Sequence, residues 1–314
     1  MMKRSFLCAA FLLMVTTRGF SADERKHYAI AILPTPVFNT PDIAGQFGGQ
    51  NGNALPTDKC GQLRAVEYVA LPATPFRIEG TIRKGTSVVY RVTTNDYPYP
   101  TTSGYFIDSR FVRTTDAKRP GRPRNLPAKS AIISDLLAAQ GSAYVWGGNI
   151  RGGIPDLSIF FPPPPHAPLD PKTDHLRQLK GVDCSGLLYE ATGGFTPRNT
   201  SALVAFGMPV PVAGMEAAEI VRRLEPLDLI AWSGHVLIVL DRERVIESRL
   251  DCTGRQGGVT VRPLRAALEE IMKRRVPLNS YQGKTVGRKK CFVVRRWYGP
   301  AAAAPLRPAS SMQE

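Results

Sequence analysis

Cys184 is the residue of this 314-residue chain whose neighbours best suit a chemical role. It stands in Asp183-Cys184-Ser185-Gly186, and apolar residues follow at helical spacing. This pattern predicts a cysteine on the first turn of a helix, where free backbone N–H groups and the helix dipole favour the nucleophilic thiolate. The alternative is a buried cysteine that only fills space in a core, and this stretch alone does not separate the two.

A histidine at the start of an apolar strand supplies the base that such a thiol needs. His235 begins the run HVLIVL, and Glu247 lies on the strand that is predicted to return after a turn at Asp241. A turn centred on Asp241 places Glu247 directly opposite His235, where the carboxylate accepts the Nδ1–H and fixes the tautomer. A loop with an even number of residues would instead send Glu247 to the other face.

The elements around these residues indicate a mixed α+β arrangement. Helices are predicted at 131–140, from Cys184 onward, at 215–224 and at 263–275, and strands at 226–232, 235–240, 245–248 and 291–298. The segment 149–182 contains four consecutive prolines, His166 and His175. Because prolines lack a donor and favour extended chain, we predict a surface loop there, either a lid or a disordered excursion. The loop spacing of the two histidines does not indicate a metal site.

The N-terminal part has a different character. Residues 1–22 combine a charged start, a short apolar run and small residues, which is typical of a secretory signal peptide. Residues 26–113 hold short alternating runs between Pro, Gly and Asn, which favours a small all-β barrel, and 104–112 resembles the closing element of bacterial SH3-like domains. Proline and basic residues at 114–129 predict a linker, and the segment 299–314 is predicted to be a flexible tail.

Charge and cysteine content restrict the partners and the compartment. The formal charge is +15, from 41 basic and 26 acidic residues, which favours anionic envelope polymer as a partner. No nucleic-acid-binding motif accompanies this charge, so nucleic acid is not expected. Loss of the signal peptide removes Cys8 and leaves four cysteines, among which Cys252 and Cys291 are the predicted disulfide pair. The absence of a CxxC motif argues against a zinc site.

Five short motifs, in this order, resemble those of the NlpC family of bacterial cell-wall cysteine peptidases: Tyr144-x-Trp146-Gly147-Gly148, Asp183-Cys184-Ser185-Gly186-Leu187, Pro197-Arg198-x-x-Ser201, Asp228-Leu229-Ile230 and Gly234-His235-Val236. The signal peptide and the SH3-like region agree with this family. The resemblance implies a papain-like catalytic domain at 130–298 that cleaves peptidoglycan stem peptides, typically between D-γ-glutamate and a diamino acid.

The resemblance also implies roles for single residues. Cys184 is the expected nucleophile, His235 the base and Glu247 the group that orients it. Tyr144 is expected near the oxyanion, and Asp183 and Ser185 at positions that help to bind substrate. Glu247 departs from the His, Asn or Gln usual in the family, although a carboxylate can also accept the imidazole proton. The long insert before Asp183 is a second departure. No metal and no organic cofactor are implied.

The sequence therefore predicts an exported, monomeric peptidoglycan hydrolase in the periplasm or cell envelope. Two alternatives remain open at this point. The same three residues would serve an N-acetylmuramoyl-L-alanine amidase, or the chain could be a catalytically inactive wall-binding protein.

Overall fold

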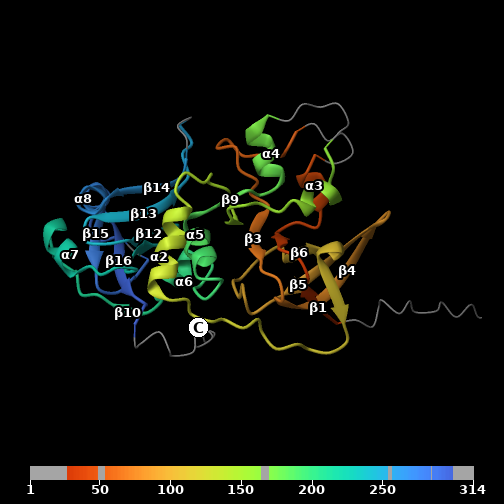
Figure 1. The fold of residues 1–314 in the computed structure, drawn as a ribbon, viewed down its shortest axis with the longest axis horizontal. Helices are drawn as coiled ribbons and strands as arrows, with labels where there is room; N and C mark the ends of the chain where they lie inside the picture. Colours follow the sequence, from red (N-terminus) through yellow and green to blue (C-terminus); the bar gives the residue numbers. More distant parts are fainter. Residues whose placement is uncertain (1–26, 49–53, 164–169, 254–256, 284, 300–314) are drawn as a thin grey trace, which may run out of the picture.

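The structure is a computed structural model that describes residues 27–48, 54–163, 170–253, 257–283 and 285–299. The predicted signal peptide, His166 and the predicted tail beyond residue 299 lie outside these ranges. Two largely antiparallel sheets make up most of this mixed α/β fold, one from the N-terminal part in red and orange and one from the C-terminal part in cyan and blue (Figure 1). Within these ranges no helix is long and apolar enough to span a membrane.

The first sheet contains the short antiparallel strands predicted for the N-terminal part, in the order β3-β2-β6-β5-β4-β1-β7. In β5, buried Tyr90 and Val92 alternate with exposed Arg91 and Thr93, the period of a strand with one face on a core. The SH3-like assignment of this region stays a prediction. The elements are β1 (Tyr28–Ala31), β2 (Thr35–Phe38), α1 (Ile43–Gln46), β3 (Val66–Ala70), β4 (Pro75–Lys84), β5 (Ser87–Thr93), β6 (Tyr105–Asp108), the 3-10 helix η2 (Ser109–Phe111) and β7 (Val112–Thr115).

The second sheet has the order β10-β16-β11-β12-β13-β14, with β15 parallel to β16 on a side branch. Its strands are β10 (Met208–Pro209), β11 (Leu229–Trp232), β12 (His235–Val239), β13 (Arg244–Arg249), β14 (Gly258–Pro263), β15 (Arg275–Leu278) and β16 (Lys290–Arg296). The helices beside it are α2 (Lys129–Ala138), α5 (Cys184–Ala191), α6 (Thr200–Leu203), α7 (Ala217–Arg223) and α8 (Leu264–Arg274).

Helices cover both faces of the second sheet. In β12, Val236 and Ile238 belong to the core shared with α2, α5 and α6, whereas Leu237 and Val239 belong to the core shared with α7 and α8. Because successive side chains of a strand point to opposite faces, a strand buried on both sides reads as a continuous apolar run, as this one does. This packing fixes the N-terminus of α5 against the start of β12.

The insert at 149–182 is not a surface loop, and that prediction was wrong for its described residues. Leu157 and Leu176 are buried in the core of the first sheet, and the Phe161 ring stacks on Phe47 at 4.8 Å between centroids. Buried Arg177 donates hydrogen bonds to the carbonyls of Phe47 and Phe161. The insert thus packs as part of the N-terminal body. It contains β8 (Asn149–Ile150), α3 (Asp156–Phe160), α4 (Pro171–Arg177) and β9 (Gly181–Val182).

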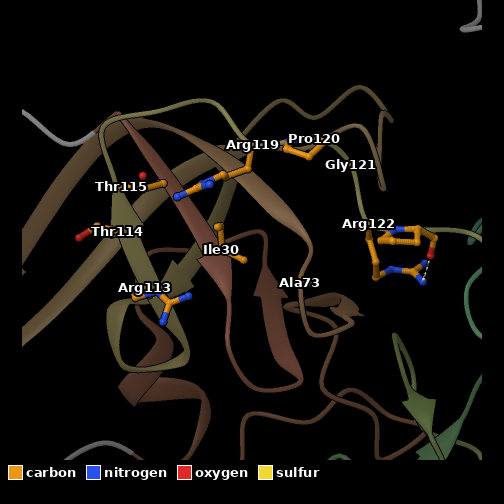
Figure 2. A pocket seen from close by; sticks show the side chains of 10 residues that line it. Ile30, Ala73, Arg113, Thr114, Thr115, Arg119, Pro120, Gly121 and Arg122 are labelled. Atoms are coloured by element: carbon orange, nitrogen blue, oxygen red, sulfur yellow. Dashed lines mark hydrogen bonds between the residues drawn. The ribbon is translucent and has the colours of Figure 1, made fainter.

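The segment at 114–129 crosses between the two sheets and is held at both. Arg122 donates to the carbonyls of Gly193 and Gly194 just after α5, and Arg124 pairs with Asp96 of the first sheet's loops at 2.7 Å. Between this segment and the edge of the first sheet lies a cavity of about 510 Å³, whose lining residues are shown in Figure 2. Its lining includes no Cys, His, Asp or Glu, so we place no chemistry there.

A disulfide joins Cys60 to Cys252, and the prediction of a Cys252–Cys291 pair was wrong. Cys291 is a buried free thiol on β16, between β11 and β15, whereas Cys252 follows β13 on a loop that reaches the N-terminal body. The bond therefore links two regions 192 residues apart in sequence.

We expect the variant Cys60→Ser/Cys252→Ser to lose about 2–4 kcal/mol of free energy of unfolding, because a bond across so long a loop restricts the unfolded chain strongly. Chemical denaturation with and without dithiothreitol measures this. Dithiothreitol should destabilise the parent to the level of the double variant and leave the variant itself unchanged. If dithiothreitol left the free energy of unfolding of the parent unchanged, this result would contradict the disulfide.

Candidate active site

Cys184 occupies the first position of α5, as predicted. Asp183 is the N-cap, and its Oδ1 accepts the Gly186 N–H at 2.7 Å. Gly186 allows a close approach, because a Cβ at this position would overlap the carbonyl oxygen of Gly148. The Cys184 side chain is largely buried, with Sγ 4.0 Å from the carbonyl oxygen of Gly234, the residue before β12. A nucleophile candidate and a histidine-bearing strand thus meet at one point.

His235 and Glu247 are in contact, but not in the predicted register. The hairpin pairs Ile238 with Ile246, and continuing this register places Glu247 opposite Leu237 rather than His235. The turn is centred one residue later than predicted, because Asp241 Oδ1 accepts the N–H groups of residues 243 and 244. The residue opposite Glu247 is thus shifted by two, from His235 to Leu237. Because side chains alternate between the faces of a sheet, a shift of two leaves Glu247 on the same face as His235. The carboxylate still reaches the ring diagonally, with His235 Nε2 2.6 Å from Glu247 Oε2.

The nitrogen that contacts Glu247 is Nε2, and the prediction of an Nδ1 contact was wrong. Nδ1 is therefore the ring nitrogen left to face other groups, and Cys184 is among the side chains that raise the pKa of the ring. Burial disfavours the charged ring, but the hydrogen bonds with Cys184 and Glu247 outweigh it and raise the pKa of His235 to about 9. The imidazole is therefore protonated at neutral pH and can act as an acid.

Glu247 is held as a carboxylate inside the protein. It is 2% exposed, and its second oxygen, Oε1, accepts a hydrogen bond from Arg262 at 2.7 Å. Burial alone would raise its pKa, but His235 and Arg262 overcome this and lower the pKa of Glu247 to about 2. Arg262 in turn pairs with Glu270 of α8. A permanent negative charge therefore stabilises the His235 imidazolium.

We expect Glu247→Gln to lower the titration midpoint of His235 by at least about one pH unit, since a neighbouring charge shifts a pKa by roughly 1–3 units. The parent ring should titrate near pH 9. NMR titration of the four histidines measures both midpoints. Glu243→Gln, in the exposed turn of the same hairpin, is the matched control and should leave the midpoint in place. An unchanged midpoint in Glu247→Gln would show that this carboxylate does not control the ring.

Arg198 is a central residue of the site. In the sequence it stood out only as part of the motif Pro197-Arg198-x-x-Ser201. Its guanidinium is 3% exposed, contacts both carboxylate oxygens of Asp183 at 2.7 and 2.9 Å, and donates to Ser185 Oγ at 2.9 Å. It also donates to the carbonyl of Gly148 and to Asn149 Oδ1. Each N–H group of the Arg198 guanidinium therefore has a hydrogen-bond acceptor, as burial of a charged group requires.

The Arg198 network extends to the first sheet through Asn149. The Asn149 side-chain amide exchanges two hydrogen bonds of 3.0 Å with the backbone of Val69 in β3. The first sheet is thereby connected to the N-terminus of α5 through three side chains.

Asp183 and Ser185 direct their polar atoms to Arg198 and to the start of α5. Both are buried, and these contacts give them a positioning role for Cys184. Their predicted role in substrate binding stays a prediction.

Tyr144 lies on the wall of a cavity of about 610 Å³ that His235 also lines, and we call this cavity the groove. Burial, with Asp183 and Cys184 nearby, raises the pKa of Tyr144 well above its ordinary value. Its hydroxyl therefore keeps its proton and can donate a hydrogen bond.

The N-terminal body contributes to the groove as well. The Arg64 guanidinium, just before β3, lies 4.0 Å from the ring centroid of Trp146, and Asp58 holds its Nε at 2.6 Å. The groove is therefore formed by both halves of the chain. Among the described side chains, no group of three or more His, Cys, Asp and Glu is placed to hold a metal ion.

Known proteins resemble this chain only weakly. No family model matches, and no curated protein matches by sequence. An NlpC/P60 family protein from Bacillus cereus ATCC 10987 is 16% identical with a TM-score of 0.32, over 90% of this chain and 66% of that one. RipD from Mycobacterium tuberculosis, described as a non-catalytic NlpC/p60 domain protein adapted to peptidoglycan binding, is 16% identical with a TM-score of 0.30, over 55% and 98%. NlpC2 from Trichomonas vaginalis is 13% identical with a TM-score of 0.29, over 87% and 72%.

These solved structures are NlpC/P60 proteins, the family to which the sequence motifs pointed. At such TM-scores the likeness carries no functional argument.

Proposed function

We propose that this protein is an NlpC-type cysteine endopeptidase that hydrolyses an amide bond in peptidoglycan stem peptides, between D-γ-glutamate and a diamino acid. The observation that carries the proposal is the convergence of Cys184, His235 and Glu247 from three separate elements, with the ring held between the thiol and a permanent carboxylate. A core cysteine has no need of a protonated histidine beside it. The choice of bond rests on the sequence motifs.

In the proposed reaction, Cys184 Sγ attacks the carbonyl carbon of the scissile amide as a thiolate. The backbone N–H of Cys184, unpaired at the first helical position, and the Tyr144 hydroxyl donate to the resulting oxyanion. His235 gives its Nδ1 proton to the departing amine, the C–N bond breaks and a thioester remains. The neutral ring then takes a proton from a water whose oxygen attacks the thioester, and the C–S bond breaks, which releases a carboxylic acid and restores the Cys184 thiolate and the protonated ring.

The remaining predictions complete the proposal. Residues 1–22 would direct export to the periplasm or envelope, 26–113 would form an SH3-like domain and 130–298 the catalytic domain. Cell-wall polymer is anionic, and the charge of +15 supports adhesion to it. We propose that the protein works as a monomer.

The test is incubation of the purified protein with defined muropeptides, followed by mass analysis, with Cys184→Ala as the inactive control. Fragments cut after D-γ-glutamate support the proposal. Free sugar chains with whole peptides would instead identify an N-acetylmuramoyl-L-alanine amidase. Binding without any cleavage would overturn the enzyme assignment and leave a wall-binding protein, which is how RipD is described.

A further inference from the structure

The groove has an excess of positive charge that its acidic residues do not neutralise. Six arginine and lysine side chains line it, together with His235, and only two acidic ones, Glu247 and Glu270. Glu247 is taken by His235 and Arg262, and Glu270 pairs with Arg262 and, at 3.5 Å, with Arg249. The remaining cations at the end of α8, 273–275, have no acidic partner among the described residues. An anionic group of a ligand would supply the missing charge.

Arg275 is the member of this cluster with a fixed position. Its guanidinium carbon lies 4.2 Å from the ring centroid of Trp232, and the Trp232 ring lies 5.3 Å from the His235 ring. Its Nη1 donates to the carbonyl oxygen of Cys291 at 3.3 Å. The guanidinium is thus anchored to an indole next to the candidate general acid, and its other N–H groups have no partner in the described structure.

Helix stabilisation does not account for this arrangement. Basic residues in the last turn of a helix favour its dipole, and that explains the exposed Lys273 and Arg274. Arg275 is instead partly buried on Trp232, and burial lowers the pKa of Arg275 from its ordinary value. A partly desolvated cation without a counter-ion is a costly feature unless a ligand pairs with it.

We propose that Arg275, supported by Trp232, binds a carboxylate of the stem peptide, so that the groove selects peptides whose carboxylates are free over those in which they are amidated. A guanidinium recognises a planar carboxylate through two parallel N–H···O bonds, and stacking on an indole fixes the plane of the fork. An uncharged carboxamide presents only one acceptor oxygen and leaves the cation uncompensated. The proposal rests on the proposed function for the identity of the substrate.

The kinetic test compares two stem peptides that differ only in having free carboxylates or carboxamides. We expect Arg275→Gln to lower kcat/KM for the carboxylate peptide by about 10–100-fold, the usual value of a charge-assisted hydrogen bond, mainly through KM. Activity on the carboxamide peptide should hardly change. Arg242→Gln makes the same charge change in the exposed turn at the far end of β12 and should affect neither peptide. Equal losses on both peptides would overturn the proposal.

A binding test separates this site from the proposed catalysis. Calorimetry with Cys184→Ala and with Cys184→Ala/Arg275→Gln measures affinity for the same peptides without turnover. Tighter binding of the carboxylate peptide that vanishes in the double variant supports the site, even if the parent cleaves nothing. If the parent cleaves both peptides but Cys184→Ala/Arg275→Gln keeps the same preference for the carboxylate peptide as Cys184→Ala, the function stands and the site is wrong. A loss of affinity only for a glycerol-phosphate oligomer would assign Arg275 to envelope polymer and overturn the substrate site.

Discussion

Replacement of Cys184 by alanine is expected to lower kcat/KM for stem peptides by at least about 10⁴-fold, because no other nucleophile in the described structure contacts His235. The expected effect on folding is small. Cys184 is 8% exposed at the edge of a core, and loss of one sulfur there removes few contacts. Rate assays on the purified variant, with its circular dichroism compared with that of the parent, measure both.

Cys291 serves as a control, because it is the other free cysteine among the residues that the structure describes. It is 2% exposed on β16, and none of the described histidines contacts it, so Cys291→Ala should retain full activity. Iodoacetamide should label Cys184 rapidly and abolish turnover, and should label Cys291 only after unfolding. If Cys184→Ala digested peptides at the parental rate, or if Cys291→Ala lost activity instead, the nucleophile assignment would fail.

The sequence predicted the parts of the site that depend on local pattern. Asp183-Cys184-Ser185-Gly186 before apolar residues indicated a helix start, and the helix does start there. The contact between His235 and Glu247 was predicted from the alternation of side chains along the two strands, and a shift of two residues does not change which face a side chain is on. The exact register could not be predicted from the sequence. The Asp241 side chain accepts hydrogen bonds from the backbone of residues 243 and 244, and these contacts move the centre of the turn by one residue.

Features that depend on distant parts of the chain could not be predicted in this way. The partner of Cys252 is Cys60 rather than Cys291, and only the three-dimensional path of the chain brings these two together. The insert was interpreted from its prolines, although Leu157 and Leu176 beside them supply the apolar surface that docks it. Arg198 was visible in the sequence, but its role required knowledge of which acceptors surround it.

Arg198→Met is expected to cost about 3–5 kcal/mol of free energy of unfolding, because it leaves the Asp183 carboxylate buried without its counter-charge. Methionine fills most of the space of the arginine stem, so the loss reports charge and hydrogen bonding rather than a cavity. Urea denaturation measures the change. Arg222→Met, on the exposed side of α7, makes the same chemical change and should stay within about 0.5 kcal/mol of the parent.

A double-mutant cycle shows whether Asp183 is the reason for the loss. Asp183→Asn removes the charge but keeps a side-chain oxygen for the Gly186 N–H, so the N-cap survives. The double variant Asp183→Asn/Arg198→Met should lose at least about 1 kcal/mol less free energy of unfolding than the sum of the two single changes, because no buried carboxylate is then left without its counter-charge. Simple additivity would mean that the two groups do not depend on each other. Because Arg198 also contacts Asn149, which bonds to Val69, a recovered double variant that remains slow would indicate that the connection to the first sheet positions the thiol.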